Sequence, residues 1–310
     1  MPPHPHPHPQ PVLGEQSPVA IFLVATVDDE TAVAALLTRV TGLARAVGLH
    51  FPGSGLELVV GIGSDAWERL FTGPRPALLR PFRAIRGARH TAPATPGDLL
   101  FHIRATGQDA CFELAHRIAR ALRGAATIVD EVHGFRYRES RDLIGFVDGT
   151  GNPTGRAAWD AVIVGDEDAA FAGGSYVHVQ RYRHDLDAWE ALSEPEQERV
   201  IGRTKRDDRE LDPAAQPSNS HVALTSTTDA DGRDLELVRA NMAYGRAGGE
   251  VGTYFAGYSR DPAVTERMLT NMVVGDPPGN HDRLLDFSTA VTGTAFFAPS
   301  ATFLENPTGL

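Results

Sequence analysis

Hydrophobic positions along the chain follow two periods, one typical of strands and one typical of helices. Apolar runs at 19–26 and 56–62 predict strands, and 99–106 alternates, with Phe101 and Ile103 on one face, which predicts a half-buried strand. An acidic start at Asp28 to Thr31 precedes a helix, and a second helix follows residue 108. Their apolar stripes are Val33, Leu36, Leu37, Val40, Leu43 and Val47, and then Cys111, Leu114, Ala115, Ile118 and Leu122.

The second part of the chain repeats this rhythm without repeating the residues. Strands are predicted at 176–182, 235–244 and 251–259, with a short helix around Trp189 and a longer helix at 263–273. The pattern therefore predicts two α+β halves, each a sheet with helices packed on one face. The join falls near 132–140, which gives halves at 18–139 and 140–310. A doubly wound fold is the weaker choice, since strands and helices do not alternate regularly.

Residues 1–17 differ in composition from the rest of the chain. His4, His6 and His8 alternate with proline, which favours an extended, solvated segment. We therefore expect a disordered tail. Its three imidazoles could bind a transition metal weakly, although a flexible solubilising arm is the simpler interpretation.

Charge and composition exclude several classes of function. The 310 residues carry 29 Lys and Arg against 40 Asp and Glu, a net charge of −11, which disfavours binding to nucleic acid or to an anionic membrane surface. The single cysteine, Cys111, excludes an intrachain disulfide and a cysteine-based zinc or iron–sulfur site. Since the sequence shows neither a membrane-spanning run nor a secretion signal, we expect a cytoplasmic protein.

The segment Gly145-Phe-Val-Asp148-Gly149-Thr-Gly151 marks a tight turn. A glycine-rich loop can cradle phosphate, but this one lacks the P-loop ending, and Asp148 would repel an anion. Two interpretations stay open. The turn is purely structural, or its glycines let the backbone approach a flat ligand and direct Asp148 at it.

His221 stands where a polar segment enters an apolar one. It is either a hydrogen-bonded structural residue or an axial ligand of a haem iron, which would need a carboxylate on its other ring nitrogen. The later segment 282–299 offers two acids for that role, Asp282 and Asp286. Its Phe296 and Phe297 are either the wall of an apolar slot or plain core.

Arg239 and Asn241 continue the apolar face of a predicted strand begun by Leu235 and Leu237. A charge on an inward face requires a partner or a ligand. The pair therefore indicates either a buried salt bridge or a ligand pocket.

Together these segments resemble the dye-decolorizing peroxidases, specifically the bacterial B class. The family signature Gly-x-x-Asp-Gly matches the turn at Asp148, the proximal histidine matches His221 in Ser-Asn-Ser-His, and the distal pair matches Arg239 and Asn241 in Val-Arg-Ala-Asn-Met. The stretch 201–208 is similar to the family segment whose arginine reaches a haem propionate, which gives that role to Arg203. The similarity runs from about 19 to 299.

The resemblance implies a fold of two ferredoxin-like halves, with one haem b per chain in the C-terminal half. It implies a homo-oligomeric peroxidase that reduces hydrogen peroxide through an oxyferryl intermediate and oxidises dyes, phenolic compounds or other one-electron donors. His221 would bind the iron with Asp286 behind it, while Asp148 and Arg239 act on peroxide. Some relatives carry a longer C-terminal tail that docks in an encapsulin shell, and residues 306–310 are too short to support that partner.

Three other functions share parts of this pattern. A haem carrier or iron-release protein would need His221 but not both Asp148 and Arg239. A chlorite-dismutase-like enzyme would not need the aspartate in its glycine-rich turn, and a haem-free α+β scaffold would be colourless. For bulky electron donors, Trp67, Trp159 and Trp189 and the six tyrosines are candidate surface-to-haem relays.

Overall fold

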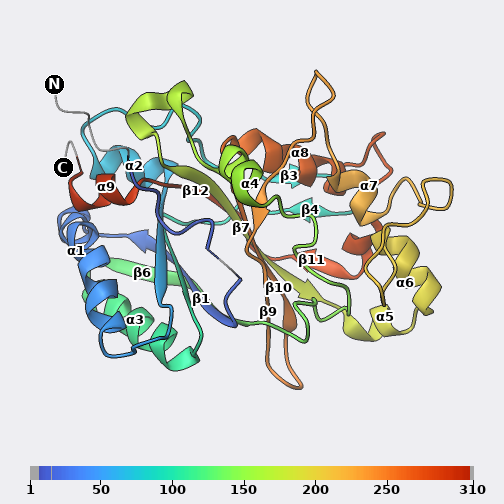
Figure 1. The fold of residues 1–310 in the computed structure, drawn as a ribbon, viewed down its shortest axis with the longest axis horizontal. Helices are drawn as coiled ribbons and strands as arrows, with labels where there is room; N and C mark the ends of the chain where they lie inside the picture. The colour runs from blue at the N-terminus through green and yellow to red at the C-terminus, as the bar shows by residue number, and fades with distance from the viewer. Residues whose placement is uncertain (1–6, 15, 308–310) are drawn as a thin grey trace.

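The computed structural model describes residues 7–14 and 16–307 (Figure 1). In the first half, two long helices and two small two-residue strands accompany four main strands. Its elements are β1 (Val19–Val27), α1 (Glu30–Gly48), β2 (Glu57–Gly63), α2 (Ser64–Leu70), β3 (Ile85–Arg86), β4 (Thr91–Ala92), β5 (Leu99–Ala105), α3 (Gln108–Ala121) and β6 (Ala126–Phe135).

The second half has more numerous and shorter helices. Figure 1 shows α5, α6, α7 and α8 on the side away from α1 and α3, whereas α9 lies beside α1. Its elements are α4 (Gly155–Val162), η1 (Asp166–Phe171), β7 (Ser175–His184), α5 (Leu186–Glu190), α6 (Glu194–Ile201), α7 (His221–Thr225), β8 (Val238–Arg239), β9 (Met242–Gly245), β10 (Val251–Ser259), α8 (Pro262–Val273), η2 (Arg283–Asp286), β11 (Ser288–Ala290), β12 (Thr294–Ala298) and α9 (Ala301–Glu305).

The main strands of both halves form one antiparallel sheet rather than two separate ones. The first half contributes the order β6-β1-β5-β2, and the second contributes β12-β7 and, through the β7–β10 pairing, β10-β9. Two further ladders, β2 with β12 and β6 with β9, join the halves. The strands therefore close into a circuit, which leaves the eight strands of the ring with partners on both sides. The mixed α+β class is as expected, but the separation into independent sheets is not.

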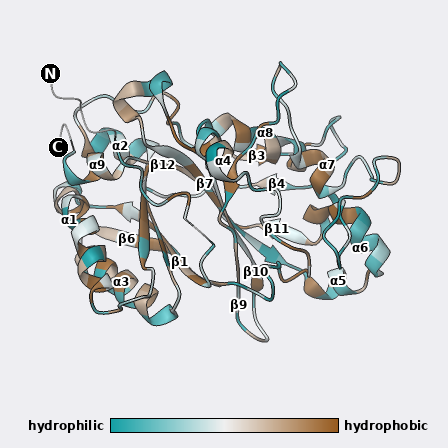
Figure 2. Ribbon diagram, in the orientation of Figure 1, coloured by the Kyte–Doolittle hydropathy of each residue, from teal (hydrophilic) through white to brown (hydrophobic). Residues whose placement is uncertain are grey.

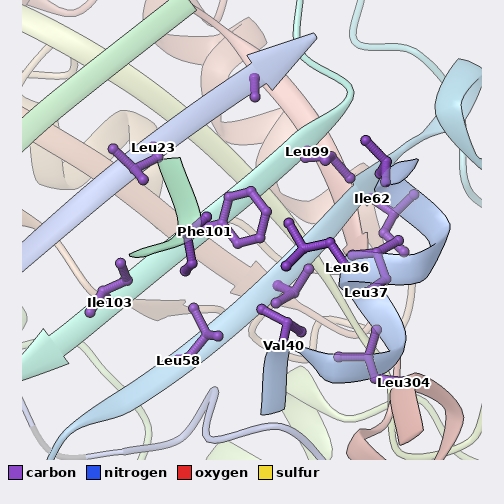
Figure 3. Packing of buried hydrophobic residues seen from close by; sticks show 14 of the residues in the cluster. Leu23, Leu36, Leu37, Val40, Leu58, Ile62, Leu99, Phe101, Ile103 and Leu304 are labelled. Carbon is purple, nitrogen blue, oxygen red and sulfur yellow. The ribbon is translucent and has the colours of Figure 1, made fainter. Parts of the chain in front are cut away.

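The larger core lies between this sheet and the helices α1 and α3. Asp29 begins α1 by accepting a 3.0 Å hydrogen bond from the backbone of Ala32. Figure 3 shows the apolar stripe of α1, with Leu36, Leu37 and Val40, directed at side chains of β2 and β5. In Figure 2 hydrophilic and hydrophobic residues stand side by side along α3, as an amphipathic helix on a sheet requires.

Strand β5 is buried on both faces, so the half-buried strand predicted there is wrong. Its second face points into the ring of strands, where the His102 ring stacks on Phe22 at 4.3 Å and its Nδ1 lies 2.8 Å from the Tyr258 hydroxyl. Arg104 donates to Glu57 at 2.6 Å on the same face. The polar side chains expected in solvent are thus buried with polar partners.

The disordered tail predicted for 1–17 is also wrong over part of its length. Gln10 and Val12 are 5% and 2% exposed. The Gln10 amide donates to the carbonyls of Val60 and Pro299 at 2.8 Å each, and its oxygen accepts from the Val60 N–H at 2.7 Å. The Gln10 side chain therefore provides hydrogen-bond partners for the backbone of Val60 in β2, which lies beyond the short ladder between β2 and β12. His4 and His6 lie outside the described residues.

The other strand and helix predictions are confirmed within a few residues, with one exception. The strand expected at 235–244 is broken into β8 and β9, both of which pair with β10. Strand β6, which covers part of the expected join, was not predicted, and only Val132 and Gly134 of its ten residues are buried. No helix in the described ranges is both long and apolar enough to cross a membrane.

Candidate active site

A cavity in the second half is lined by four residues that the sequence singled out: Asp148, His221, Arg239 and Asn241. They reach it from the loop after β6, from α7, from β8 and from the residues just before β9. Most of the remaining lining is apolar and comes from β10, α8 and η2 together with the same loop. It includes Ile144, Phe146, Leu237, Phe255, Met268, Leu269, Met272, Leu284 and Leu285.

The loop that carries Asp148 folds back on itself. The Asp148 N–H donates to the carbonyl of Ser140 at 2.8 Å, and Arg141 forms a bridge with Val147. Gly145 and Gly149 both have left-handed backbone, with φ of 93° and 78°. A side chain at Gly145 would in addition meet Lys205, so these two glycines are required by the turn itself.

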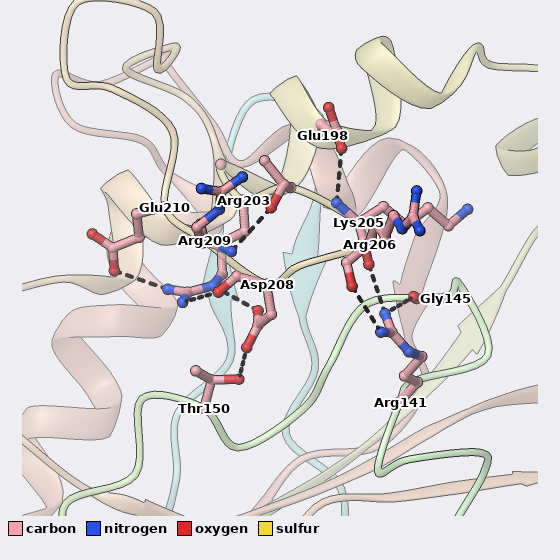
Figure 4. Close-up of polar contacts among 12 residues, drawn as sticks. Arg141, Gly145, Thr150, Glu198, Arg203, Lys205, Arg206, Asp208, Arg209 and Glu210 are labelled. Atoms are coloured by element: carbon pink, nitrogen blue, oxygen red, sulfur yellow. Dashed lines mark hydrogen bonds and ion pairs between the residues drawn. The ribbon is translucent and has the colours of Figure 1, made fainter.

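A second segment, 203–210, holds this loop from outside (Figure 4). The Arg141 guanidinium donates to the carbonyls of Gly145 and Lys205 at 2.9 and 2.7 Å. Asp208 accepts from Thr150 at 2.5 Å and from Arg203 at 2.8 Å. The loop of Asp148 is thereby bound to the segment before α7, which begins at His221.

The backbone of Arg239 is held by the side chain of Asn152, which precedes Pro153. Asn152 accepts from the Arg239 N–H at 2.9 Å and donates to the Arg239 carbonyl at 2.8 Å. Strand β8 pairs with β10, and this two-point contact gives the Arg239 backbone a second partner. The Asn-Pro dipeptide signals a turn, but nothing in the sequence indicates which backbone Asn152 would bind.

Asn241 connects Asp148 to strand β10. Its amide donates to Asp148 Oδ1 at 3.1 Å, and its oxygen accepts from the Ala256 N–H in β10 at 3.2 Å. Burial and, to a smaller extent, the negative charge of Asp142 raise the pKa of Asp148 against the opposing effects of Asn241 and Arg239, and the net result is a pKa of about 6. Burial therefore outweighs the arginine, and Asp148 titrates near neutral pH.

Asp142 and His184 also line the cavity, and the sequence analysis missed both. His184 Nε2 lies 3.2 Å from Asp142 Oδ1, and Thr253 donates to the other carboxylate oxygen. Burial opposes the ionisation of Asp142, but His184 and the hydrogen bonds hold its pKa below the ordinary value. Asp142 is therefore a second charged carboxylate near Asp148. Neither residue stands in a recognisable motif.

His221 opens helix α7 behind the buried cap residue Ser220. Its Nδ1 donates to Asp282 Oδ2 over 2.7 Å, and the Asp282 carboxylate is fully buried. The other oxygen of Asp282 accepts from the Leu284 N–H at 2.8 Å and so caps η2. A buried carboxylate with two fixed partners thus orients the ring and leaves Nε2 for a ligand.

Asp286 was expected in the position that Asp282 occupies, and that prediction is wrong. Asp286 ends η2, one turn away, and its Oδ1 lies 3.0 Å from His90 Nε2 and 3.1 Å from His281 Nε2. Because the cap position turns Asp282 inward, Asp286 is directed at the surface, where a quarter of its side chain is exposed.

Two further groups do not line the cavity. Arg203 donates to Asp208 and, at 2.9 Å, to Glu210, which occupies its guanidinium within the network of Figure 4. Phe296 and Phe297 are 1% and 0% exposed and belong to the two large core clusters. The interpretation of this pair as core is therefore confirmed.

Comparison with known proteins identifies the family. The model of the Dyp-type peroxidase N-terminal domain matches residues 9–136, and that of the C-terminal domain matches residues 139–303. A dye-decolorizing peroxidase of Mycobacterium tuberculosis is 60% identical over 300 residues, covering 96% of this chain and 90% of the relative. The chain belongs to the Dyp-type peroxidase family, and it is a haem-dependent peroxidase.

Solved structures agree with this assignment. The encapsulated DyP-type peroxidase of Mycobacterium smegmatis has a TM-score of 0.96 and 59% identity, covering 98% of this chain and 99% of that one. A variant of the Rhodococcus jostii enzyme in complex with haem has a TM-score of 0.94 and 54% identity, covering 96% and 98%. The cofactor is haem b. The apolar lining of the cavity suits the haem ring, and His221, whose Nδ1 is bound to Asp282, can offer Nε2 to the iron.

Proposed function

We propose that this enzyme reduces hydrogen peroxide and oxidises one-electron donors at a haem b bound in the cavity of the C-terminal half. The observation that carries the proposal is the composition of that single cavity. It contains a histidine paired with a buried carboxylate, together with an aspartate, an arginine and an asparagine. A haem carrier would need the first feature without the others.

His221 would hold the iron through Nε2, with Asp282 accepting the proton of Nδ1. When bound, haem supplies the redox chemistry, a site for peroxide and the electrons that cleave its O–O bond. The buried Asp282 carboxylate makes the imidazole more anionic and fixes its orientation, which favours the oxidised states of an iron that it binds.

Asp148 moves the proton. As a carboxylate it takes a proton from one oxygen of hydrogen peroxide and returns it to the other, which leaves as water. Its pKa of about 6 suits both steps, because the group is mostly ionised at neutral pH and still basic enough to accept a proton. Asn241 holds the carboxylate in place through its 3.1 Å hydrogen bond.

Arg239 stabilises the negative charge that develops on the departing oxygen. Its guanidinium carries a permanent charge into a largely apolar cavity, and Asn152 fixes the backbone from which it extends. Burial lowers the pKa of Arg239, an effect that the charge of Asp148 opposes, and the group stays cationic.

Structures of the Rhodococcus jostii relative support these assignments. Variants with an aspartate or an arginine replaced were solved in complex with haem, and one with an asparagine replaced in complex with manganese. In their own chain these three residues have the same types and the same spacing as Asp148, Arg239 and Asn241.

Two finer features of the family belong to the proposal. Each half is of the ferredoxin type, which the strand orders β6-β1-β5-β2 and β9-β10-β7-β12 support. Arg203 binds a haem propionate. To do so, its guanidinium would divide its hydrogen bonds between Asp208 and the propionate, or give up Asp208. Haem titration of Arg203→Ala tests the second feature.

The reductants are dyes, phenolic compounds or similar donors. Trp159 is the surface tryptophan, 42% exposed, whereas Trp67 and Trp189 are 1% exposed and packed in the core. Electron entry from a bulky donor is therefore best tested with Trp159→Phe.

A cytoplasmic homo-oligomer is part of the proposal, and one relative is encapsulated. Particle size after gentle lysis tests both assembly states.

The direct test compares absorption spectra of the purified protein before and after one equivalent of hydrogen peroxide. We expect a Soret band that changes with peroxide and recovers when a reducing dye is added. His221→Ala should lose most of the bound haem, while the exposed His50→Ala serves as its control. A Soret band that peroxide leaves unchanged would instead identify a haem carrier.

A further inference from the structure

Two histidines and a carboxylate meet at the surface, outside the haem cavity. His90 lies in the turn between β3 and β4, His281 follows α8, and Asp286 ends η2. One ligand atom from each, His90 Nε2, His281 Nε2 and an Asp286 oxygen, lies within 4.8 Å of the other two. None of the three residues lines the cavity of His221 and Asp148.

Two of the three separations between these atoms match those of ligands around one small ion. Both Nε2 atoms approach the same oxygen, Asp286 Oδ1, at 3.0 and 3.1 Å. Ligands bound to zinc at about 2.1 Å are separated by about 3.0–3.4 Å along the edges of an octahedron or tetrahedron. An ion could therefore enter after small side-chain rotations, without movement of the backbone.

The chemistry of the ligands selects the kind of ion. Two imidazoles with one carboxylate suit Zn²⁺, Co²⁺ or Ni²⁺ better than Mg²⁺ or Ca²⁺, which prefer oxygen. The three side chains are 21%, 14% and 25% exposed, so water can complete the coordination. Arg89 comes within 4.0 Å of Asp286, but its side chain is 67% exposed and can turn away.

The three ligands come from both halves of the chain. His90 belongs to the first half, while His281 and Asp286 belong to the second, and the strands beside His90 pack against α8. An ion at this place would bind the β3–β4 turn to the segment that carries Asp282. It would therefore stabilise the folded state in proportion to its occupancy.

We propose that His90, His281 and Asp286 form a binding site for one divalent transition-metal ion, with Zn²⁺ as its probe. The experiment uses the full chain with its haem. All proteins carry His4, His6 and His8 replaced by glutamine, because the tail could bind zinc by itself. Zinc affinity is measured by competition with a chromophoric chelator, and zinc per chain by atomic emission after dialysis.

One zinc ion should be retained per chain. His90→Ala, His90→Gln and Asp286→Asn should each weaken zinc binding at least about 10–100-fold, the loss that follows removal of even an outer partner of a metal ligand. His133→Ala is the matched control, since His133 pairs with Glu131 at 2.7 Å without a second histidine. It should bind zinc like its parent.

Thermal unfolding gives an independent readout. Zinc should raise the Tm of the parent and of His133→Ala, and leave the Tm of His90→Gln unchanged. The zinc-free Tm of each variant shows that it is folded. The proposal is overturned if the parent retains no zinc after dialysis, or if the three ligand variants bind zinc as tightly as the parent.

Discussion

Opposing influences meet at the Asp148 carboxyl, and their balance determines how the site works. Arg239 and Asn241 favour the charged form, whereas burial and the nearby charge of Asp142 disfavour it. Burial is the largest influence, so the pKa rises to about 6 instead of falling below 3.8. The sequence identifies both opposing causes but not their sizes, because burial is a property of the whole fold.

The first prediction concerns the pH dependence of the reaction with peroxide. The rate constant should fall about tenfold for each pH unit below about 6, as Asp148 becomes protonated and stops acting as a base. Arg239→Leu removes a neighbour that lowers this pKa, so the acid limb should move to higher pH. Arg239→Lys, which keeps the charge, should leave it close to its original position. Stopped-flow measurements between pH 4 and 8 decide this.

The second prediction concerns stability. The pKa of Asp148 rises from 3.8 to about 6 on folding. Because each pKa unit corresponds to about 1.4 kcal/mol, ionised Asp148 lowers the free energy of unfolding by about 3 kcal/mol. This cost is absent below pH 4 and complete above pH 6. Asp148→Asn should therefore gain free energy of unfolding relative to the parent as the pH rises.

Urea unfolding at pH 4 and pH 8, at equal haem content, measures that difference. The gain of Asp148→Asn should grow by up to about 3 kcal/mol between the two values. A gain that is the same at both pH values would mean that the pKa of Asp148 is not raised in the fold.

At the scale of elements, the short helical turn η2 decides which carboxylate serves His221. Asp282 stands at its start, where one oxygen caps the turn and the other accepts from the histidine. Asp286 stands at its end and is directed at His90 and His281. The sequence could narrow the choice to these two acids. The preference of aspartate for the cap position of a helical turn favours Asp282 over Asp286 as the partner of His221.

The third prediction separates these two acids. Asp282→Asn keeps an oxygen for the cap but presents an amide to His221, so haem affinity or peroxidase activity should fall about 10–100-fold and the reduction potential should rise. Asp286→Asn in zinc-free buffer is the control and should leave both unchanged. Equal losses in the two variants would contradict the assignment of Asp282.

At the scale of the whole molecule, the closed sheet explains where prediction from sequence stopped. Helix α1 was predictable because its cap and apolar stripe are local. The burial of His102 and Arg104 was not, because it requires the ring of strands that encloses the second face of β5. The packed Gln10 was missed for the same reason, since its partners lie on β2 and at Pro299. The candidate site followed from motifs, whereas Asn152, Asp142 and His184 depend on contacts distant in sequence.

The fourth prediction tests the packed N-terminal segment. Gln10→Ala leaves buried groups of Val60 and Pro299 without their hydrogen bonds, so the free energy of unfolding should fall by about 1–3 kcal/mol. The exposed Gln16→Ala is the matched control and should change it by less than about 0.5 kcal/mol. Equal stabilities would return residues 7–14 to the disordered tail predicted at first.

The central claim is that Asp148 and Arg239 activate peroxide in the cavity of His221. Its most direct test is the rate constant for the reaction with one equivalent of hydrogen peroxide at pH 7, followed at the Soret band. Asp148→Ala should lower it by about 10²–10⁴-fold and Arg239→Leu by about 10²–10³-fold, with haem content unchanged. If both variants react as fast as the parent, neither residue has the role assigned to it.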